Sequence, residues 1–144
     1  MAFSLARILA ARQVIRGVAD ATPLVPSPFM TRACGHDFHL KLENMQPIGA
    51  FKLRGAYNAV MTLPEGIAGV TCCSTGNHGR GVAYAARERG LRAVVCLSAL
   101  APEAKVAGVR ALGAEVRIIG DSQEDAQAEA VRLAAEGGCT DIQP

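Results

Sequence analysis

The sequence predicts an α/β fold in which a parallel sheet is covered by helices on both faces. From Gly69 onward, short apolar runs alternate with helix-length segments whose apolar residues recur at helical spacing. The connections between them are short and marked by glycine or proline, as in repeated strand–helix–strand units with right-handed crossovers. The strand candidates are apolar throughout rather than alternating, so both faces of the sheet should be buried.

The segment before this repeat is less regular. An apolar stripe at helical spacing predicts a helix over 3–18. The prolines within 22–28 predict an extended loop after that helix. Alternation around Leu40 predicts a short strand. Gly49-Ala50 then leads into a second helix, which Pro64-Glu65-Gly66 should end.

The repeat itself is built from strands and helices in strict alternation. The predicted strands are 69–73, 92–97, 114–119 and 139–142. The first predicted helix spans 77–89, and Gly90 stops it. Pro102 opens the second, and Gly113 stops it. Asp121 or Ser122 caps the third, which ends at Gly137-Gly138. We therefore place a three-layer α/β domain at 66–144 and assign 1–65 to an N-terminal segment.

Composition narrows the class of function. Of the 144 residues, 50% are hydrophobic and 19% are charged, which is typical of a globular domain large enough to bury a core. The net charge is +2 and no run of like charge occurs, so we expect neither nucleic acid nor a membrane surface as a partner. No apolar run approaches the ~20 residues that a membrane-spanning helix needs.

The cysteines indicate a reducing compartment. There are five, an odd number, and their spacing matches no metal site. We therefore predict free thiols, no bound metal and a cytoplasmic location. Cys72, Cys73 and Cys96 fall inside predicted strands and should be small buried core residues.

Lys52 stands at the start of the helix that follows Gly49-Ala50. A lysine there opposes the helix dipole, so stability alone would not select it. The same field disfavours the protonated ammonium, and a neutral amine is what attack on a carbonyl carbon requires. Phe51 beside it offers an apolar face to a flat ring. The ordinary alternative is a solvated lysine near a helix start.

The segment Ser74-Thr75-Gly76-Asn77-His78-Gly79 follows a predicted strand and opens a predicted helix. Glycines let backbone N–H groups approach a ligand closely, and a helix N-terminus attracts anions. The hydroxyl and carboxamide side chains add donors. The ordinary alternatives are a helix cap and a structural histidine. A nucleophilic amine together with an anion-binding turn indicates pyridoxal-phosphate (PLP) chemistry.

Three motifs together resemble the fold-type-II PLP-dependent enzymes, and among them the threonine/serine dehydratase and serine racemase family. They are Lys41-Leu-Glu-Asn44, Gly49-Ala-Phe-Lys-Leu-Arg-Gly-Ala56 and the segment 74–79. The stretch 72–87 also resembles the dehydratase branch of hydroxyectoine utilisation. The resemblance runs from about Thr22 to Pro144. It implies that 66–144 is the small domain of such an enzyme and that 1–65 belongs to its large domain.

The resemblance also implies a role for each site residue. Lys52 would bind the PLP aldehyde as a Schiff base and later move the Cα proton. Phe51 would pack against the cofactor ring, and Asn77 would bond its hydroxyl. The substrate carboxylate would be held by Ser74, Thr75, Asn77 and His78. Thr75 stands where the family's racemases use serine as a second acid/base, and its extra methyl favours elimination over racemization.

The implied reaction is α,β-elimination of a small β-hydroxy amino acid, such as threonine or serine, to a 2-oxo acid and ammonia. The family's glycine-rich phosphate loop and its partner for the pyridine nitrogen do not occur here. We therefore interpret the chain as the N-terminal portion of such an enzyme, homo-oligomeric when intact, and expect little activity from the chain alone. Three alternatives stay open: a fragment that does not hold PLP, an amino-acid racemase of the same family, and a nucleotide-binding Rossmann-like domain. The last lacks a G-x-G-x-x-G turn after its first strand.

Overall fold

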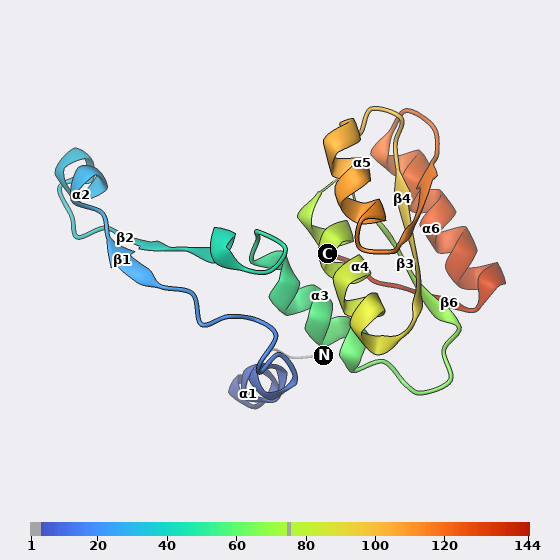
Figure 1. The fold of residues 1–144 in the computed structure, drawn as a ribbon, viewed down its shortest axis with the longest axis horizontal. Helices are drawn as coiled ribbons and strands as arrows, with labels where there is room; N and C mark the ends of the chain where they lie inside the picture. The colour runs from blue at the N-terminus through green and yellow to red at the C-terminus, as the bar shows by residue number, and fades with distance from the viewer. Residues whose placement is uncertain (1–3, 75) are drawn as a thin grey trace.

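A computed structural model describes residues 4–74 and 76–144, which form a layered α/β body with an N-terminal arm (Figure 1). The arm consists of α1 (Leu5–Val14), β1 (Leu24–Pro26), α2 (Pro28–Cys34), β2 (His39–Lys41) and the 3-10 turn η1 (Glu43–Met45). β1 and β2 pair antiparallel and carry α2 at the end far from the sheet. The helix α3 (Lys52–Met61) then leads into the body.

Two parts of the arm differ from the prediction. α1 ends at Val14 rather than at residue 18, because Ile15 caps it and Gly17 takes a positive φ of 82°. None of its residues is buried, so its apolar stripe faces no core. The helix α2 begins within the predicted extended loop. Ser27 caps it by accepting a hydrogen bond from the amide of Met30, and Pro28 occupies its first turn.

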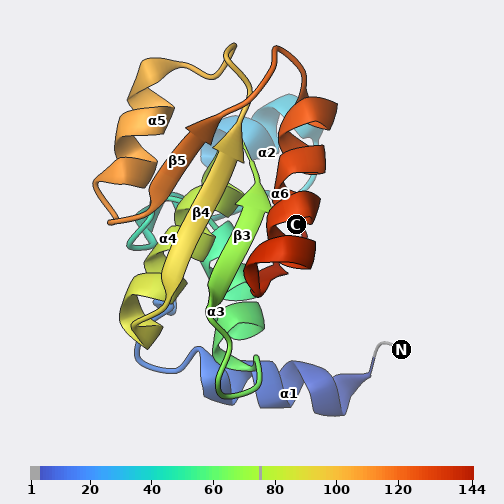
Figure 2. The same ribbon diagram turned by 90° about the vertical axis from the view of Figure 1, so that its right-hand side faces the viewer.

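The predicted parallel sheet is confirmed. Its strands are β3 (Gly69–Cys73), β4 (Arg92–Leu97), β5 (Glu115–Ile118) and β6 (Cys139–Asp141). They are all parallel and lie in the order β5-β4-β3-β6. Figure 2 shows β3, β4 and β5 side by side in one direction. The chain moves outward from β3 to β5 and then returns to place β6 on the other side of β3.

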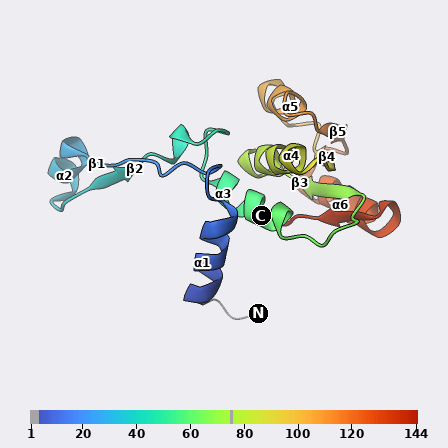
Figure 3. The ribbon, with the colours of Figure 1, turned by 60° about the horizontal axis from the view of Figure 1, so that its bottom comes forward.

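Each face of the sheet has its own helical layer, as predicted. α4 (Asn77–Arg89) and α5 (Glu103–Arg110) cover one face, and α6 (Gln123–Gly137) covers the other (Figure 1 and Figure 3). Neighbouring strand residues point to opposite faces. Cys72 therefore packs into the core below α4 and α5, while Cys73 packs against α6.

The ends of α4 and α6 follow the sequence signals closely, whereas α5 ends at Arg110, before the predicted stop at Gly113. Ser122 is the cap of α6, and its Oγ accepts a hydrogen bond from the amide of Asp125 at 3.1 Å. Gly90 and Gly138 end α4 and α6 with φ values of 69° and 67°, which favour glycine. Pro102 is the cap of α5.

The helix α3 packs directly on α4, because Gly81 allows the two backbones to approach. A Cβ at Gly81 would lie 2.8 Å from the Cβ of Ala56 and 3.3 Å from the carbonyl oxygen of Lys52. Arg89 fixes the other end of α3 by donating to the carbonyls of Val60, Leu63 and Pro64. A cation at the C-terminal end of a helix also suits the helix dipole.

Because of this packing, α3 shares a core with the sheet: Ala56 and Val60 belong to the same buried cluster as Val70 and Val82. The domain division between residues 65 and 66 stays a prediction.

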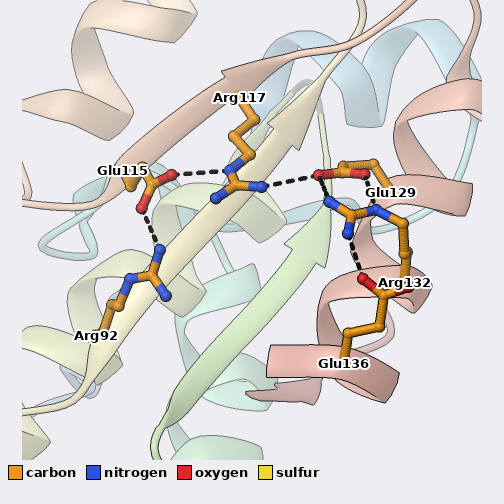
Figure 4. Close-up of polar contacts among 6 residues, drawn as sticks. All are labelled: Arg92, Glu115, Arg117, Glu129, Arg132 and Glu136. Carbon is orange, nitrogen blue, oxygen red and sulfur yellow. Dashed lines mark hydrogen bonds and ion pairs between the residues drawn. The ribbon is translucent and has the colours of Figure 1, made fainter. Parts of the chain in front are cut away.

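An exposed network of charges links β4, β5 and α6 (Figure 4). Arg117 donates to Glu115 at 2.8 Å and to Glu129 at 2.9 Å. Arg92 pairs with the same Glu115, and Arg132 pairs with the same Glu129. The guanidinium of Arg132, followed by that of Arg117, lowers the pKa of Glu129 to about 2. Exposed pairs of this kind contribute little to stability one by one.

The cysteines are free thiols: Cys34 is exposed and the others are buried. Burial raises the pKa of Cys72 and raises that of Cys96 to about 11. No helix within 4–74 and 76–144 is long and apolar enough to cross a membrane. Across the same residues, no group of three or more His, Cys, Asp or Glu side chains is arranged to hold a metal.

Candidate functional site

Lys52 is the first residue of α3, and its side chain is partly buried. The preceding loop directs it, since Ile48 and Ala50 are buried together with Leu53 in one apolar cluster. The Nζ of Lys52 lies 5.6 Å from the centroid of the Phe51 ring. That ring is 59% exposed, so a flat ligand could reach it.

The turn after β3 lies at the carboxyl edge of the sheet. Ser74 is buried, and its Oγ accepts a hydrogen bond from the amide of Gly76 at 3.2 Å. Gly76 caps α4 with no side-chain hydrogen bond, and Asn77 is the exposed first residue of the helix. The first N–H groups of α4 are therefore available to an anion. Thr75, predicted to be catalytic and substrate-binding, lies outside the described residues.

The strand order explains why this edge can form a site. The crossovers through α4 and α5 lie on one face, whereas the crossover through α6 lies on the other. The connections therefore diverge between β3 and its neighbour β6. Ligands in open parallel sheets bind at such a point, outside the carboxyl ends of the strands.

The structure brings the two predicted segments together in one cavity of about 400 Å³. Lys52 and Phe51 line it from α3, and Ser74, Asn77 and His78 line it from the β3–α4 turn. A second cavity of about 390 Å³ also has Lys52 in its lining, together with Arg54, Gly55 and Gln143, among others. Both cavities share Phe51, Lys52, His78 and Pro144.

His78 has a structural contact in addition to its place in the cavity wall. It is 6% exposed, and its Nε2 lies 2.7 Å from the carbonyl oxygen of Ile142. Because a carbonyl only accepts, Nε2 must donate in this bond. The histidine therefore joins the first turn of α4 to the segment that follows β6.

Three residues of this cavity lining, Cys73, Gln123 and Pro144, were not predicted as site residues from sequence. Cys73 and Gln123 also line the cavity, and the carboxamide Nε2 of Gln123 donates to the Cys73 sulfur at 3.0 Å. Burial, followed by the charge of Asp141, raises the pKa of Cys73. Cys73 and Gln123 end a strand or begin a helix at the carboxyl edge, and that position is the signal that could have identified them.

Arg54, in the first turn of α3, is hydrogen-bonded to Glu43 of η1. The Nε of Arg54 donates to Glu43 at 2.9 Å, and its terminal nitrogen donates at 2.7 Å. These bonds, together with those from Thr22 and Gln46, outweigh the opposing effect of burial and lower the pKa of Glu43 to about 2. Arg54 therefore binds Glu43, and it lines the second cavity but not the one that holds Ser74 and Asn77.

Comparison with known proteins agrees with this geometry. A candidate threonine dehydratase of Sinorhizobium fredii is 49% identical over 143 residues, which are 98% of this chain and 43% of that protein. Maize serine racemase has a TM-score of 0.93 at 32% identity, over 100% of this chain and 44% of that structure. Threonine deaminase isoform 2 of Solanum lycopersicum has a TM-score of 0.85 at 30% identity, over 100% and 42%.

The chain thus spans less than half the length of each of these relatives. Residues 15–144 match the family described as "Pyridoxal-phosphate dependent enzyme". The matched segment contains the whole sheet and every residue of the candidate site. The chain belongs to this family of PLP-dependent enzymes.

Proposed function

We propose that this chain supplies the amine and the anion-binding turn of a PLP-dependent lyase. The substrate is a small β-hydroxy amino acid, threonine or serine, and the products are a 2-oxo acid and ammonia. The observation that carries the proposal is that Lys52 lines one cavity together with Ser74 and residues 76–78. The relatives named as threonine dehydratase and threonine deaminase support the choice of substrate.

The residues of this cavity fit the ring end of the cofactor. The amine of Lys52 suits the aldehyde, and the exposed face of Phe51 suits the pyridine ring. The carboxamide of Asn77 suits the ring hydroxyl. Among the described residues lining this cavity, Lys52 is the sole lysine or arginine. The phosphate group therefore has no cationic partner in this lining.

Each of these residues has a defined task in the proposed reaction. The amine of Lys52 would hold the cofactor through its aldehyde and take the proton from Cα. The N–H groups at the start of α4, with Ser74, would hold the substrate carboxylate. When bound, PLP acts as the electron sink for the carbon that loses its proton. Asn77 would orient the cofactor ring by bonding the ring hydroxyl.

A racemase of the same family is the second candidate. The likeness to maize serine racemase, with its TM-score of 0.93, favours it. The two reactions begin with the same proton at Cα and differ in whether a second group returns a proton to the other face. The hydroxyl of Thr75 is the group in question, and its added methyl favours elimination.

Borohydride trapping tests the proposal directly. PLP is added to the 144-residue chain, the adduct is reduced and peptides are mapped. We expect the label on Lys52, and we expect Lys52→Ala to lose it while Lys105→Ala keeps it. A label confined to Lys41 or Lys105 would contradict the assignment. In a chain with turnover, release of a 2-oxo acid indicates the lyase, and formation of D-serine indicates the racemase.

A further inference from the structure

The carboxylate of Glu43 is surrounded by hydrogen-bond donors. Its Oε1 accepts from the hydroxyl of Thr22 at 2.6 Å and from the terminal nitrogen of Arg54 at 2.7 Å. Its Oε2 accepts from the Nε of Arg54 at 2.9 Å and from the carboxamide of Gln46 at 3.3 Å. Thr22 and Gln46 are buried, at 5% and 3% exposure, so solvent does not easily replace them.

Arg54 and Gln46, which bind Glu43, also bind the backbone of Asp20 in the segment that follows α1. Arg54 donates to the carbonyl oxygen of Asp20 at 2.8 Å. Gln46 accepts from the amide of Asp20 at 3.0 Å and donates to its carbonyl at 2.9 Å. The bonds around Glu43 thus join three separate chain segments: 20–22, 43–46 and the first turn of α3.

Lys52 lies between two of the residues that form these bonds. Gln46 holds the chain six positions before it, and Arg54 holds it two positions after it. The intervening loop is packed by buried Ile48 and Ala50, and Gly49 turns it with a φ of 70°. The bonds of Gln46 and Arg54 thus restrain the backbone on both sides of Lys52.

We propose that Glu43 is the positioning residue of Lys52: its bonds to Arg54, Thr22 and Gln46 hold the amine where the cofactor aldehyde is bound. The inference rests on the proposed function, since it assigns Glu43 a task in that reaction. Glu43 itself lines neither of the cavities beside Lys52. It acts through Arg54 and the loop.

The replacement Glu43→Gln tests this role because it keeps the size of the side chain. Every described contact of the carboxylate is a donor, so the amide NH₂ must face a donor whichever way it turns. Thr22→Val is the milder second variant, since it removes one hydrogen bond and changes no charge. Glu103→Gln is the control, because Glu103 is exposed and pairs with Arg110 at 3.6 Å on α5.

Two measurements are made on the folded 144-residue chain. Amide hydrogen exchange reports the protection of 43–54, with α4 as the internal reference. PLP trapping with borohydride reports the labelling of Lys52 relative to Lys105, which stands on α5. We expect Glu43→Gln to speed exchange in 43–54 and to lower the labelling ratio about tenfold. A tenfold change corresponds to the free energy lost with one charged hydrogen bond. Thr22→Val should shift both in the same direction by less, and Glu103→Gln should shift neither.

The outcomes separate this inference from the proposed function. Exchange and labelling that stay at wild-type values in Glu43→Gln would overturn the positioning role. If Glu43→Gln does not fold, unchanged values in Thr22→Val would overturn it equally. If the wild-type chain labels Lys52 no better than Lys105, the proposed function fails. Exchange in 43–54 then still decides whether Glu43 holds the loop.

Discussion

At the scale of single residues, the cysteines differ sharply in their surroundings. Cys34 is exposed at the end of α2, whereas Cys72, Cys73, Cys96 and Cys139 are buried. Since the thiolate is the reactive form, burial that raises the pKa of Cys72, Cys73 and Cys96 slows their reaction.

We therefore predict that one thiol of the native chain reacts rapidly with a disulfide reagent. Cys34→Ser should remove this fast phase, and the remaining thiols should react only as the protein unfolds. Absorbance of the released thiolate, recorded with and without denaturant, measures both phases. A fast phase that persists in Cys34→Ser would show that the cavity residue Cys73 is accessible.

Glu43 should also determine how stability responds to acid. Its pKa falls from the ordinary 4.5 to about 2 on folding, mainly because Arg54 donates to it. A carboxyl with a lowered pKa stabilises the fold fully above its ordinary pKa, and this contribution disappears as the pH falls toward its folded pKa. The difference in unfolding free energy between wild type and Glu43→Gln should thus be largest near neutrality and shrink between pH 4.5 and pH 2.

Urea unfolding at several pH values measures that difference. Glu103→Gln serves as the comparison, since its carboxylate is 81% exposed. A gap between wild type and Glu43→Gln that stayed constant down to pH 2 would contradict the lowered pKa.

How far the site could be predicted depends on the distance of each contact along the chain. The joining of Lys52 with the 74–78 turn followed from a rule about strand ends, and the cavity confirms it. The bond between Glu43 and Arg54 spans a loop of unpredictable path. The bond between His78 and Ile142 spans 64 positions and depends on β6 pairing with β3. Neither has a local signal.

At the scale of helices and strands, the prediction failed where one signal has two meanings. Proline at Pro28 interrupts an extended chain, but after a serine it also opens a helix, and the structure has the helix. The body was easier, because its helices α4 and α6 end at Gly90 and Gly138 and pack on a sheet. In the arm, no residue of α1 is buried and its cap is Ile15 rather than a glycine, so pattern alone did not determine where α1 ends.

The contact between α3 and α4 yields a matched pair of variants. Gly81→Ala places a methyl 2.8 Å from the Cβ of Ala56, so α3 must shift away. We expect a loss of about 1–3 kcal/mol, the usual cost of overpacking. Gly108→Ala on α5 meets its nearest atom at 3.7 Å, and we expect it to be neutral or slightly stabilising because alanine favours helix.

Chemical denaturation of both variants measures these changes. Because a Cβ at Gly81 would also lie 3.3 Å from the carbonyl oxygen of Lys52, Gly81→Ala should additionally lower PLP trapping at Lys52. Equal stability of the two variants would show that the helices separate without cost.

At the scale of the whole molecule, the arm leaves apolar surface uncovered. Leu5, Ile8 and Leu9 are 69%, 45% and 48% exposed on one side of α1. Exposed apolar patches promote association. We predict that the chain self-associates with rising concentration, and that Leu5→Gln with Leu9→Gln reduces this. Leu100→Gln, which changes a separate residue with 76% exposure, should not. Sedimentation velocity over a concentration series distinguishes the variants, and a monomer at all concentrations would contradict the prediction.

The cavity also bears on activity. With Lys52 the sole described lysine or arginine in its lining, this cavity offers the phosphate of a bound cofactor no cation that would help to orient the ring. Orientation can supply roughly 7–11 kcal/mol of a barrier. We therefore expect little release of 2-oxo acid from L-threonine or L-serine by the 144-residue chain with excess PLP. Robust turnover that Lys52→Ala abolishes would contradict this expectation.

The place of β6 in the sheet determines when this site can form during synthesis. A ribosome delivers the chain from its N-terminus, so β3, β4 and β5 emerge before residue 139. Until then one edge of β3 has no neighbour, and His78 has not met the carbonyl of Ile142 that it bonds. The lysine and the anion-binding turn are therefore made before the segment that follows β6, from which Pro144 also lines the cavity. A nascent chain arrested before residue 139 would carry both segments beside an edge of β3 that has no neighbouring strand.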